Sequence, residues 1–202
     1  MAARGDLSTE RVVAAAMDLL DRDGLDAFSM RGLAAELGVA SPTLYWHVAS
    51  RAELLNQVAD RIVLQGQMGP PEAGESWDAW LERRARGYRD ALLAHRDAAR
   101  IVGGATHLSQ SLPEFENELA ALVSLGFTPP QALQLVTTAS LFTLGHVLQM
   151  QGGTTRDPSA PAPDMTHLPT LRDAVHGAGG ADPTFTAGLR IILAGASSQF
   201  DA

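Results

Sequence analysis

Apolar residues recur at spacings of three and four residues along almost the whole chain of 202 residues. Val12, Val13, Ala16, Leu19 and Leu20 show the pattern most clearly, and they would lie on one face of an α-helix. Strict alternation of apolar and polar residues, which marks half-buried β-strands, is almost absent. The chain is therefore predicted to be all-α.

Glycine residues and capping motifs mark the expected helix ends. Four glycines follow periodic segments, where many helices end in left-handed backbone, and they are Gly24, Gly38, Gly126 and Gly152. Three capping boxes, in which a hydroxyl residue precedes Glu or Gln by three positions, begin at Ser50, Ser111 and Thr128. These signals predict helices at about 9–23, 30–37, 42–47, 51–66, 77–95, 112–125, 129–151, 168–177 and 184–200, with a short turn at 97–102.

Two segments lack helical periodicity. The first, residues 66–74, is rich in glycine and proline, and it separates an N-terminal domain, residues 1–66, from a C-terminal domain, residues 67–202. The second, residues 152–169, contains a stretch without core-forming residues and is predicted to be a mobile loop.

The composition excludes several classes of protein. The chain has no cysteine, so it has no disulfide framework, no thiol nucleophile and no cysteine-built zinc site. Residues 1–6 lack the apolar segment of a signal peptide, and no run reaches the ~18 apolar residues of a membrane span. We therefore expect a cytoplasmic protein with no membrane partner. The net charge of −8, with arginine as the only basic residue type apart from histidine, by itself disfavours nucleic-acid binding.

Residues 29–47 have the pattern of two short helices around a tight turn at Gly38. Leu33, Ala34 and Leu44 would form part of the small core between them, and the small side chain of Ala34 lets the helices approach closely. This arrangement is typical of a helix-turn-helix.

The second of these helices has more polar and aromatic surface than its core can cover. Thr43, Tyr45, Trp46 and His47 place a hydroxyl group, two aromatic rings and an imidazole on barely two turns. Such a surface fits a major groove, where these groups meet phosphates, base edges and thymine methyl groups. The alternative is that Tyr45 and Trp46 pack against the preceding helix.

The order of the residues favours DNA binding. Residues 42–48 (PTLYWHV), followed by residues 51–55 (RAELL), closely resemble the DNA-binding domain of the tetracycline repressor (TetR) family. The resemblance continues, in order and with similar gaps, through residues 74–77, 91–93, 96–97, 142–145 and 147–148. It covers most of the chain and implies a homodimeric, ligand-responsive repressor of transcription.

In this family, the matching positions contact the bases or the backbone of double-stranded operator DNA. They are Arg31, Ser41, Pro42, Thr43, Tyr45, Trp46, His47 and Arg51. Residues 1–66 hold six arginines and nine acidic residues, so the net charge of this domain is −3 and binding must depend on local groups. The expected groups are Arg31, Arg51 and the backbone N–H groups at helix starts.

The C-terminal domain is large enough to hold a ligand cavity, and Arg84 and Tyr88 lie on one face of helix 77–95. The resemblance implies an inducer pocket at Gln67, Arg84, Tyr88, Val102, Ala105, Thr106, His107, Ser111, Phe115, Glu118, Leu133, Val136, Thr137, Leu141 and Gln149. The alternative for each apolar residue in this set is an ordinary place in the core.

Tetracycline-binding members of the family hold a metal through an imidazole and, through water, a carboxylate and a hydroxyl group. The matching positions are Val102, Gln149 and Ala105, so we expect no metal and no cofactor. The predicted inducer is not a magnesium–tetracycline chelate but an apolar organic molecule with an anionic or strongly accepting group near Arg84. A pair between Arg84 and Glu118 would remove the preference for an anion.

Other motifs point to no different chemistry. Residues 74–76 (GES) lack the closing glycine and the preceding strand of a nucleophile elbow, so Ser76 is expected to be a helix N-cap. Glu114, Glu116 and Glu118 are expected on a solvated helix face, in which only Glu118 could turn inward. No catalytic group is visible, so an enzyme is disfavoured. A ligand-binding protein that has lost DNA binding remains an alternative because of the −3 charge.

The last long helices, 129–151 and 184–200, are apolar on more than one face. Gly195 and Ala196 leave a seam of small residues on the second helix, so one face can pack within the subunit and another against a two-fold mate. We therefore predict a homodimer through a four-helix bundle. Helix 51–66 joins the two domains and is the predicted lever between ligand and DNA.

Overall fold

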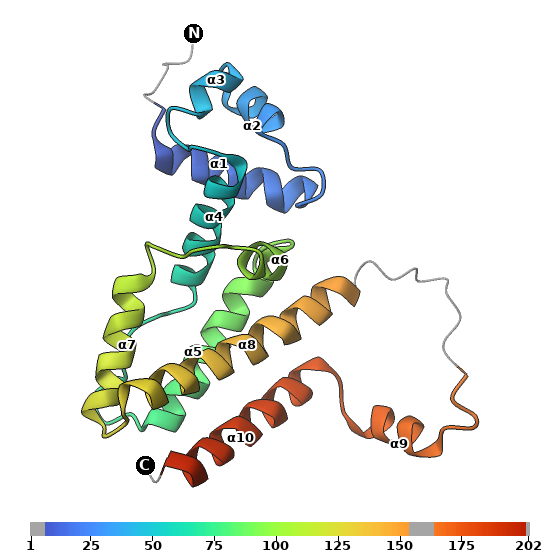
Figure 1. The fold of residues 1–202 in the computed structure, drawn as a ribbon. Coiled ribbons are helices and arrows are strands. Elements are labelled where there is room, and N and C mark those ends of the chain that lie inside the picture. The colour runs from blue at the N-terminus through green and yellow to red at the C-terminus, as the bar shows by residue number, and fades with distance from the viewer. Residues whose placement is uncertain (1–6, 154–163, 201–202) are drawn as a thin grey trace.

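The computed structural model describes residues 7–153 and 164–200, and every regular element in these two stretches is a helix (Figure 1). The helices are α1 (Thr9–Asp23), α2 (Met30–Leu37), α3 (Ser41–Leu44), α4 (Arg51–Gln65), α5 (Trp77–Leu93), α6 (Ala98–Gly103), α7 (Leu112–Ser124), α8 (Pro129–Gly153), α9 (Pro169–Gly177) and α10 (Ala181–Phe200). The all-α prediction is confirmed. Helices α1 to α3 form a small head, and α5 to α8 and α10 form a larger body (Figure 1).

The head is a small bundle closed by α4. Val12, Leu33, Leu44 and Leu54 are each completely buried in its core, and burying each such side chain contributes roughly 1.5–3 kcal/mol. Gly38 turns the chain between α2 and α3 with left-handed backbone (φ 67°, ψ 30°), a conformation that favours glycine. Helices α2 and α3 therefore form a helix-turn-helix.

Serine residues start three of the first four helices. Ser8, Ser29 and Ser50 are the N-caps of α1, α2 and α4, and each hydroxyl oxygen accepts a bond from the backbone N–H three residues later. Gln131 Oε1 accepts a bond of 2.8 Å from the Thr128 N–H, which is the reciprocal half of a capping box at the start of α8.

The capping box predicted at Ser111 is wrong. Its side chain makes no bond to the start of α7. The hydroxyl group donates instead to Asp60 on α4 at 2.8 Å. Ser111 has helical backbone (φ −85°, ψ −10°), whereas the capping serines of α1, α2 and α4 have extended backbone.

Helix α4 runs from the head into the body, and its end lies directly against α5 (Figure 1). A Cβ atom on Gly87 would lie 2.7 Å from the Gly66 carbonyl oxygen. The two backbones can approach this closely only because residue 87 is glycine. This contact positions the lower end of α4 beside the cavity described below.

The body is organised around α5 and α8. Trp80 and Leu81 of α5, Leu122 of α7 and Val136 of α8 are completely buried together. Helix α10 packs along α8 through Phe185, which is also buried. Helix α9 has no buried residue and stands away from the body (Figure 1). Within the described stretches, no helix has the length and apolar content needed to cross a membrane.

The second helix of the helix-turn-helix is shorter than predicted. It ends at Leu44 rather than at residue 47, and the next residues form tight turns. The Tyr45 N–H donates to the Pro42 carbonyl oxygen at 3.2 Å, which is a bond of the i to i+3 type. This tightening brings Val48 into the core of the head, where its side chain is buried.

Helix α8 continues two residues past the predicted end at residue 151, through Gly153, so the left-handed helix end expected at Gly152 is wrong. Gly152 faces open space and has no positive φ angle, so its backbone is that of an ordinary helical residue. The loop predicted between residues 152 and 169 falls mostly on residues 154–163, which lie outside the described stretches.

Candidate functional site

The most exposed aromatic residues of the head follow α3. Tyr45 is 52% exposed and Trp46 is 87% exposed. The packing alternative is therefore wrong for Trp46, and about half of the Tyr45 surface is open to solvent. A tryptophan left almost wholly in water contributes little to the stability of the fold, and its exposure favours a contact with another molecule.

The other residues predicted to contact DNA lie on α2, on α3 or directly after α3, with one exception. Arg31 and Pro42 are exposed, whereas Ser41, Thr43 and His47 are half-buried at and after the start of α3. Arg51 is the exception. Its guanidinium group lies over the Phe28 ring at 5.6 Å and lines a crevice between α4 and α6.

The positive charge of the helix-turn-helix comes from single arginine side chains, as expected from the net charge of −3 in residues 1–66. Arg22 on α1 is neutralised by Glu36, at 2.9 Å between Nη2 and Oε2. Arg31, at the start of α2, has no carboxylate partner among the described residues. It is therefore a cation of the helix-turn-helix that is available for a phosphate or a base edge.

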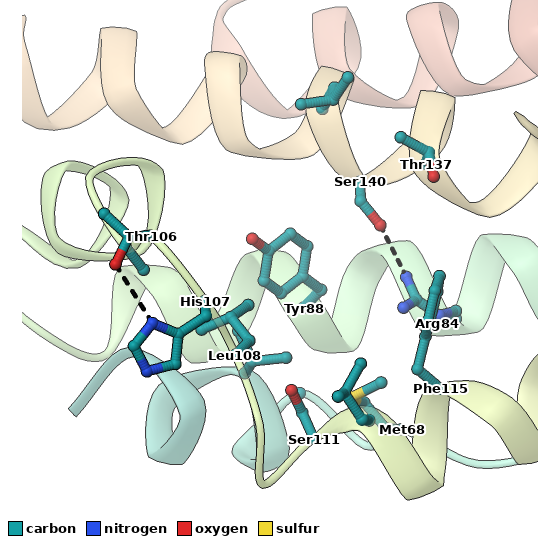
Figure 2. A pocket seen from close by; sticks show the side chains of 15 residues that line it. Met68, Arg84, Tyr88, Thr106, His107, Leu108, Ser111, Phe115, Thr137 and Ser140 are labelled. Carbon is teal, nitrogen blue, oxygen red and sulfur yellow. Dashed lines mark hydrogen bonds between the residues drawn. The ribbon is translucent and has the colours of Figure 1, made fainter. Parts of the chain in front are cut away.

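A cavity of about 440 Å³ lies in the body between α5, α7, α8 and the segment before α7 (Figure 2). The predicted ligand residues that line it are Arg84, Tyr88, Ala105, Thr106, His107, Ser111, Phe115, Thr137 and Leu141. Its wall is mostly apolar, and most of its polar side chains lie at the two ends of the cavity (Figure 2). This size and lining are typical of a site for a small organic molecule.

Six predicted ligand residues lie outside the cavity wall, and they are Gln67, Val102, Glu118, Leu133, Val136 and Gln149. Gln67 has left-handed backbone (φ 56°), so the chain turns and Met68 lines the cavity in its place. Val102 and Val136 are buried in the core, which was the stated alternative for apolar residues. Leu133 and Gln149 are exposed to solvent.

Sequence reasoning missed several lining residues, which are Val63, Gly66, Met68, Leu108, Leu112 and Ser140. Most of them lie at the end of α4 or in the segments before α5 and α7, where helical period predicts nothing. Ser140 had a usable signal, because it follows Thr137 by three residues and therefore shares its face of α8.

Arg84 and Glu118 form a buried ion pair beside the cavity. Arg84 Nε lies 2.9 Å from Glu118 Oε2, and the side chains are 7% and 0% exposed. Arg84 Nη1 also donates to Ser140 Oγ at 3.0 Å (Figure 2). The pair removes the basis for expecting an anionic group on the ligand, since that expectation depended on an uncompensated Arg84.

Glu118 is the inward-turned member of the acidic cluster on α7. Its Oε1 accepts a bond of 3.1 Å from the Gly69 N–H, so the carboxylate also holds the segment before α5. Burial raises the pKa of Glu118, and the nearby Arg84 charge opposes that rise.

Tyr88 lies one turn after Arg84 on α5, and its ring borders the cavity (Figure 2). Burial raises the pKa of its hydroxyl group to about 12, so the group is protonated at neutral pH. This hydroxyl group has no hydrogen-bond partner among the described residues. It is therefore a donor that a bound molecule could use.

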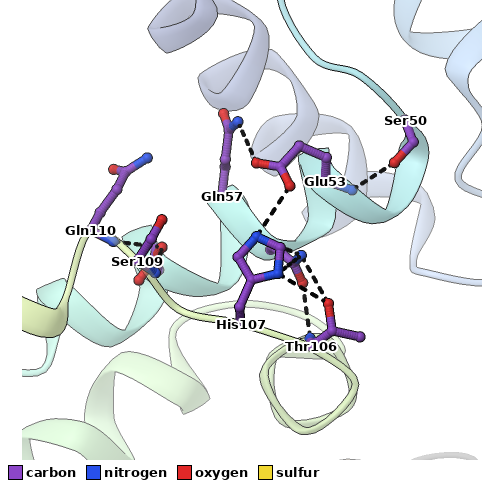
Figure 3. Close-up of polar contacts among 9 residues, drawn as sticks. Ser50, Glu53, Gln57, Thr106, His107, Ser109 and Gln110 are labelled. Atoms are coloured by element: carbon purple, nitrogen blue, oxygen red, sulfur yellow. Dashed lines mark hydrogen bonds and ion pairs between the residues drawn. The ribbon is translucent and has the colours of Figure 1, made fainter.

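The segment before α7 is tied to α4 by a polar cluster that we call the α4 clasp, namely Glu53, Asn56, Thr106 and His107 (Figure 3). The Thr106 N–H donates to Asn56 Oδ1 at 3.0 Å, so Asn56 Nδ2 faces His107. That nitrogen lies 3.1 Å from His107 Nδ1 and 3.4 Å from His107 Nε2. His107 Nε2 in turn lies 3.2 Å from Glu53 Oε2.

One turn further along α4, Asp60 holds the same segment. Its carboxylate accepts bonds from the backbone N–H groups of Ser109, Gln110 and Ser111, at 2.9 to 3.0 Å. Since Thr106, His107 and Ser111 also line the cavity, the cavity wall is attached directly to α4.

The described residues offer no obvious metal site. They contain no group of three histidine, aspartate or glutamate residues placed to hold a metal ion. Val102, at one of the positions that would have to coordinate, is buried among apolar neighbours and has no donor atom.

Comparison with known families identifies the architecture. A family model described as "Bacterial regulatory proteins, tetR family" matches residues 12–58. A second model, "Tetracyclin repressor-like, C-terminal domain", matches residues 70–200. The chain belongs to the TetR family. It is a DNA-binding transcriptional regulator with a helix-turn-helix domain and a ligand-binding domain.

Curated and solved TetR-family relatives span nearly the whole chain. The class D tetracycline repressor of Escherichia coli is 34% identical over 200 residues, which cover 97% of this chain and 92% of the relative. ActR of Streptomyces coelicolor, solved in complex with actinorhodin, is 32% identical, with a TM-score of 0.80 and coverage of 96% and 98%. The class A repressor in complex with 5a,6-anhydrotetracycline and magnesium is 30% identical, with a TM-score of 0.74 and coverage of 95% and 99%.

Proposed function

We propose that this chain is a homodimeric repressor that is released from a palindromic operator when a small organic molecule enters the cavity of its body. The observation that carries the proposal is the α4 clasp, because it joins the cavity wall to the helix that supports the DNA-binding head. A ligand that alters the wall therefore alters the position of α4.

For DNA binding, we assign base contacts to Tyr45, Trp46 and Arg31, supported by their exposure and by the lack of a carboxylate partner for Arg31. Ser41, Pro42, Thr43 and His47 lie around them and would contact the bases or the backbone. The guanidinium group of Arg51 lies over the Phe28 ring, so we assign Arg51 no contact with bases.

For the ligand, we propose an organic molecule other than a magnesium–tetracycline chelate. Relatives have been solved with minocycline, with 5a,6-anhydrotetracycline and magnesium, and with actinorhodin. The position that would supply the imidazole ligand is Val102 here, and this valine lies in the core rather than on the cavity wall. A metal chelate would therefore lose its direct protein ligand.

For the coupling, thermodynamic linkage requires that the ligand prefer a conformation that does not fit the operator. In a two-fold dimer, the two recognition helices must match successive major grooves, roughly 34–36 Å apart. A rotation of α4 that changes this spacing would release the DNA.

For the dimer, we propose an interface made by α8 and α10. Leu133 and Leu148 on α8 and Ile191 on α10 are exposed in the single chain, and Ile191 is 74% exposed. A groove between these helices is lined by Ile192, Gly195 and other residues of both. An apolar surface of this kind is typical of a helix-bundle interface between subunits.

The test is a gel-shift titration with the DNA that flanks the gene of this protein. Wild-type protein should bind one fragment specifically, and Tyr45→Ala or Arg31→Ala should each lose about 1–3 kcal/mol of binding free energy. Since both side chains are exposed, the two variants should unfold at the wild-type urea concentration. A folded Tyr45→Ala protein with unchanged affinity would contradict the assignment.

A folded wild-type protein that binds no flanking fragment would favour the alternative, a ligand-binding protein that has lost DNA binding. The −3 charge of residues 1–66 makes this comparison necessary. The titration should therefore be repeated at low and moderate salt, because phosphate contacts weaken steeply as salt rises.

A further inference from the structure

The arginine that lines the cavity has its charge paired by a carboxylate. Arg84 is the one arginine on the described wall, and Glu118 is buried directly behind it, with 2.9 Å between Nε and Oε2. His107, at the other end of the wall, lies 3.2 Å from Glu53 through Nε2. Tyr88 is protonated, with a pKa of about 12.

The same wall has hydrogen-bond donors that are not used. A guanidinium group has five N–H donors, and Arg84 uses one with Glu118 and one with Ser140. The other three, and the Tyr88 hydroxyl group, have no partner among the described residues. Arg84 is 6% exposed and Tyr88 is 9% exposed, and the cavity is the space that both side chains border (Figure 2).

A ligand that displaces water from these donors must supply acceptors in its place, because a donor covered by a ligand and left without a partner is costly. A carboxylate would also supply acceptors, but its charge would have to leave water and share one guanidinium group with Glu118. A neutral carbonyl oxygen supplies the same acceptor without either cost. The ion pair therefore makes charge, and not only shape, a criterion for entry.

We propose that the cavity selects neutral, largely apolar ring molecules that present carbonyl oxygens to Arg84 and Tyr88. Glu118 is then a specificity-determining residue that excludes carboxylates, although it does not line the cavity itself. This inference rests on the ligand-binding part of the proposed function and names the chemical class of the ligand.

The test uses three probes with the same three rings: fluorene, fluorenone and fluorene-9-carboxylate. Fluorene has no polar group, fluorenone has a neutral carbonyl and fluorene-9-carboxylate has a carboxylate, and the two polar groups are on the same carbon atom. Dissociation constants are measured by quenching of tryptophan fluorescence. Wild-type protein should bind fluorenone about tenfold or more tightly than either of the others. A wild-type protein that prefers the carboxylate, or that binds none of the three probes, overturns the proposal.

The matched variant is Glu118→Gln, which keeps the size of the side chain and removes its charge. Fluorene-9-carboxylate should gain roughly tenfold in affinity relative to fluorenone, because the Arg84 charge is no longer compensated. Glu116→Gln, an exposed position on the same helix, should leave the ratio unchanged. If the ratio of the two affinities is unchanged in Glu118→Gln, the proposal is overturned. If that variant does not fold, the order of the wild-type affinities for the three probes decides.

The binding measurements contain no DNA, so this inference and the repressor function fail separately. A protein that shows the predicted order of probes but binds no operator refutes the repressor function alone. A repressor that is released from its operator but binds the carboxylate most tightly refutes the neutral-ligand class alone.

Discussion

Replacing Asp60 with alanine tests whether α4 holds the cavity wall. Asp60 is 1% exposed and accepts four hydrogen bonds, three from backbone N–H groups and one from the Ser111 hydroxyl group. Ser109 and Gln110 are exposed, so water can replace the carboxylate at their N–H groups. Ser111 is buried, and its two donors would be left without an acceptor.

The size of the effect follows from this difference between the exposed and the buried donors. Hydrogen bonds to a charged group contribute about 1.5–3 kcal/mol each, and a buried donor left unpaired costs about 1–3 kcal/mol. The variant recovers the cost of burying the carboxylate, which offsets part of this loss. We expect Asp60→Ala to lower the free energy of unfolding by about 2–4 kcal/mol, and Asp60→Asn, which keeps one acceptor oxygen, by about half as much.

The assay is urea unfolding at one protein concentration, since the stability of a dimer depends on concentration. Hydrogen exchange adds a local readout, because the N–H groups of residues 109–111 should exchange faster in both variants than in the wild type. Asp18→Ala is the matched control, as Asp18 is an exposed aspartate on α1. If Asp60→Ala unfolds no more easily than Asp18→Ala and exchange at residues 109–111 is unchanged, the reasoning is refuted.

Three further predictions follow from other contacts. Gly87→Ala should lower stability by more than about 1 kcal/mol, because its Cβ atom would lie 2.7 Å from a backbone oxygen at the end of α4; unfolding at the wild-type midpoint would contradict this close approach. Arg84→Met should cost about 3–5 kcal/mol at neutral pH by leaving the buried Glu118 unpaired. Because the pKa of Glu118 is already raised in the folded protein and rises further without Arg84, the stability of this variant should recover as the pH falls from 7.5 toward 5, and a loss that is independent of pH would exclude this cause. Gly195→Glu has open space around it in the single chain, so it should dissociate the dimer in sedimentation experiments without unfolding the subunit; a dimer of unchanged stability would exclude this interface.

The helices and the exposed face of the helix-turn-helix followed from the sequence because both depend on residues close together in the chain. The apolar period, the serine N-caps and the left-handed turn at Gly38 act over a few positions. Tyr45 and Trp46 were expected at the surface because so short a helix cannot bury them, and they are exposed. Even here α3 ends at Leu44, three residues before the predicted end, and Val48 is buried in the core of the head.

The lining of the cavity and the partners of its polar groups were decided by the tertiary structure. Gln67 was expected in the cavity, but left-handed backbone at that residue placed Met68 there instead. Ser111 has the pattern of a capping box, yet it bonds Asp60, 51 positions away in the chain.

The charge of the cavity was decided in the same way. Arg84 alone predicted an anionic ligand, and Glu118, 34 positions further along the chain, neutralises it. A hydrogen bond or an ion pair depends on distances of about 3 Å between atoms of different helices. Helical period determines which face a residue lies on, but only the packing of the helices determines which faces meet.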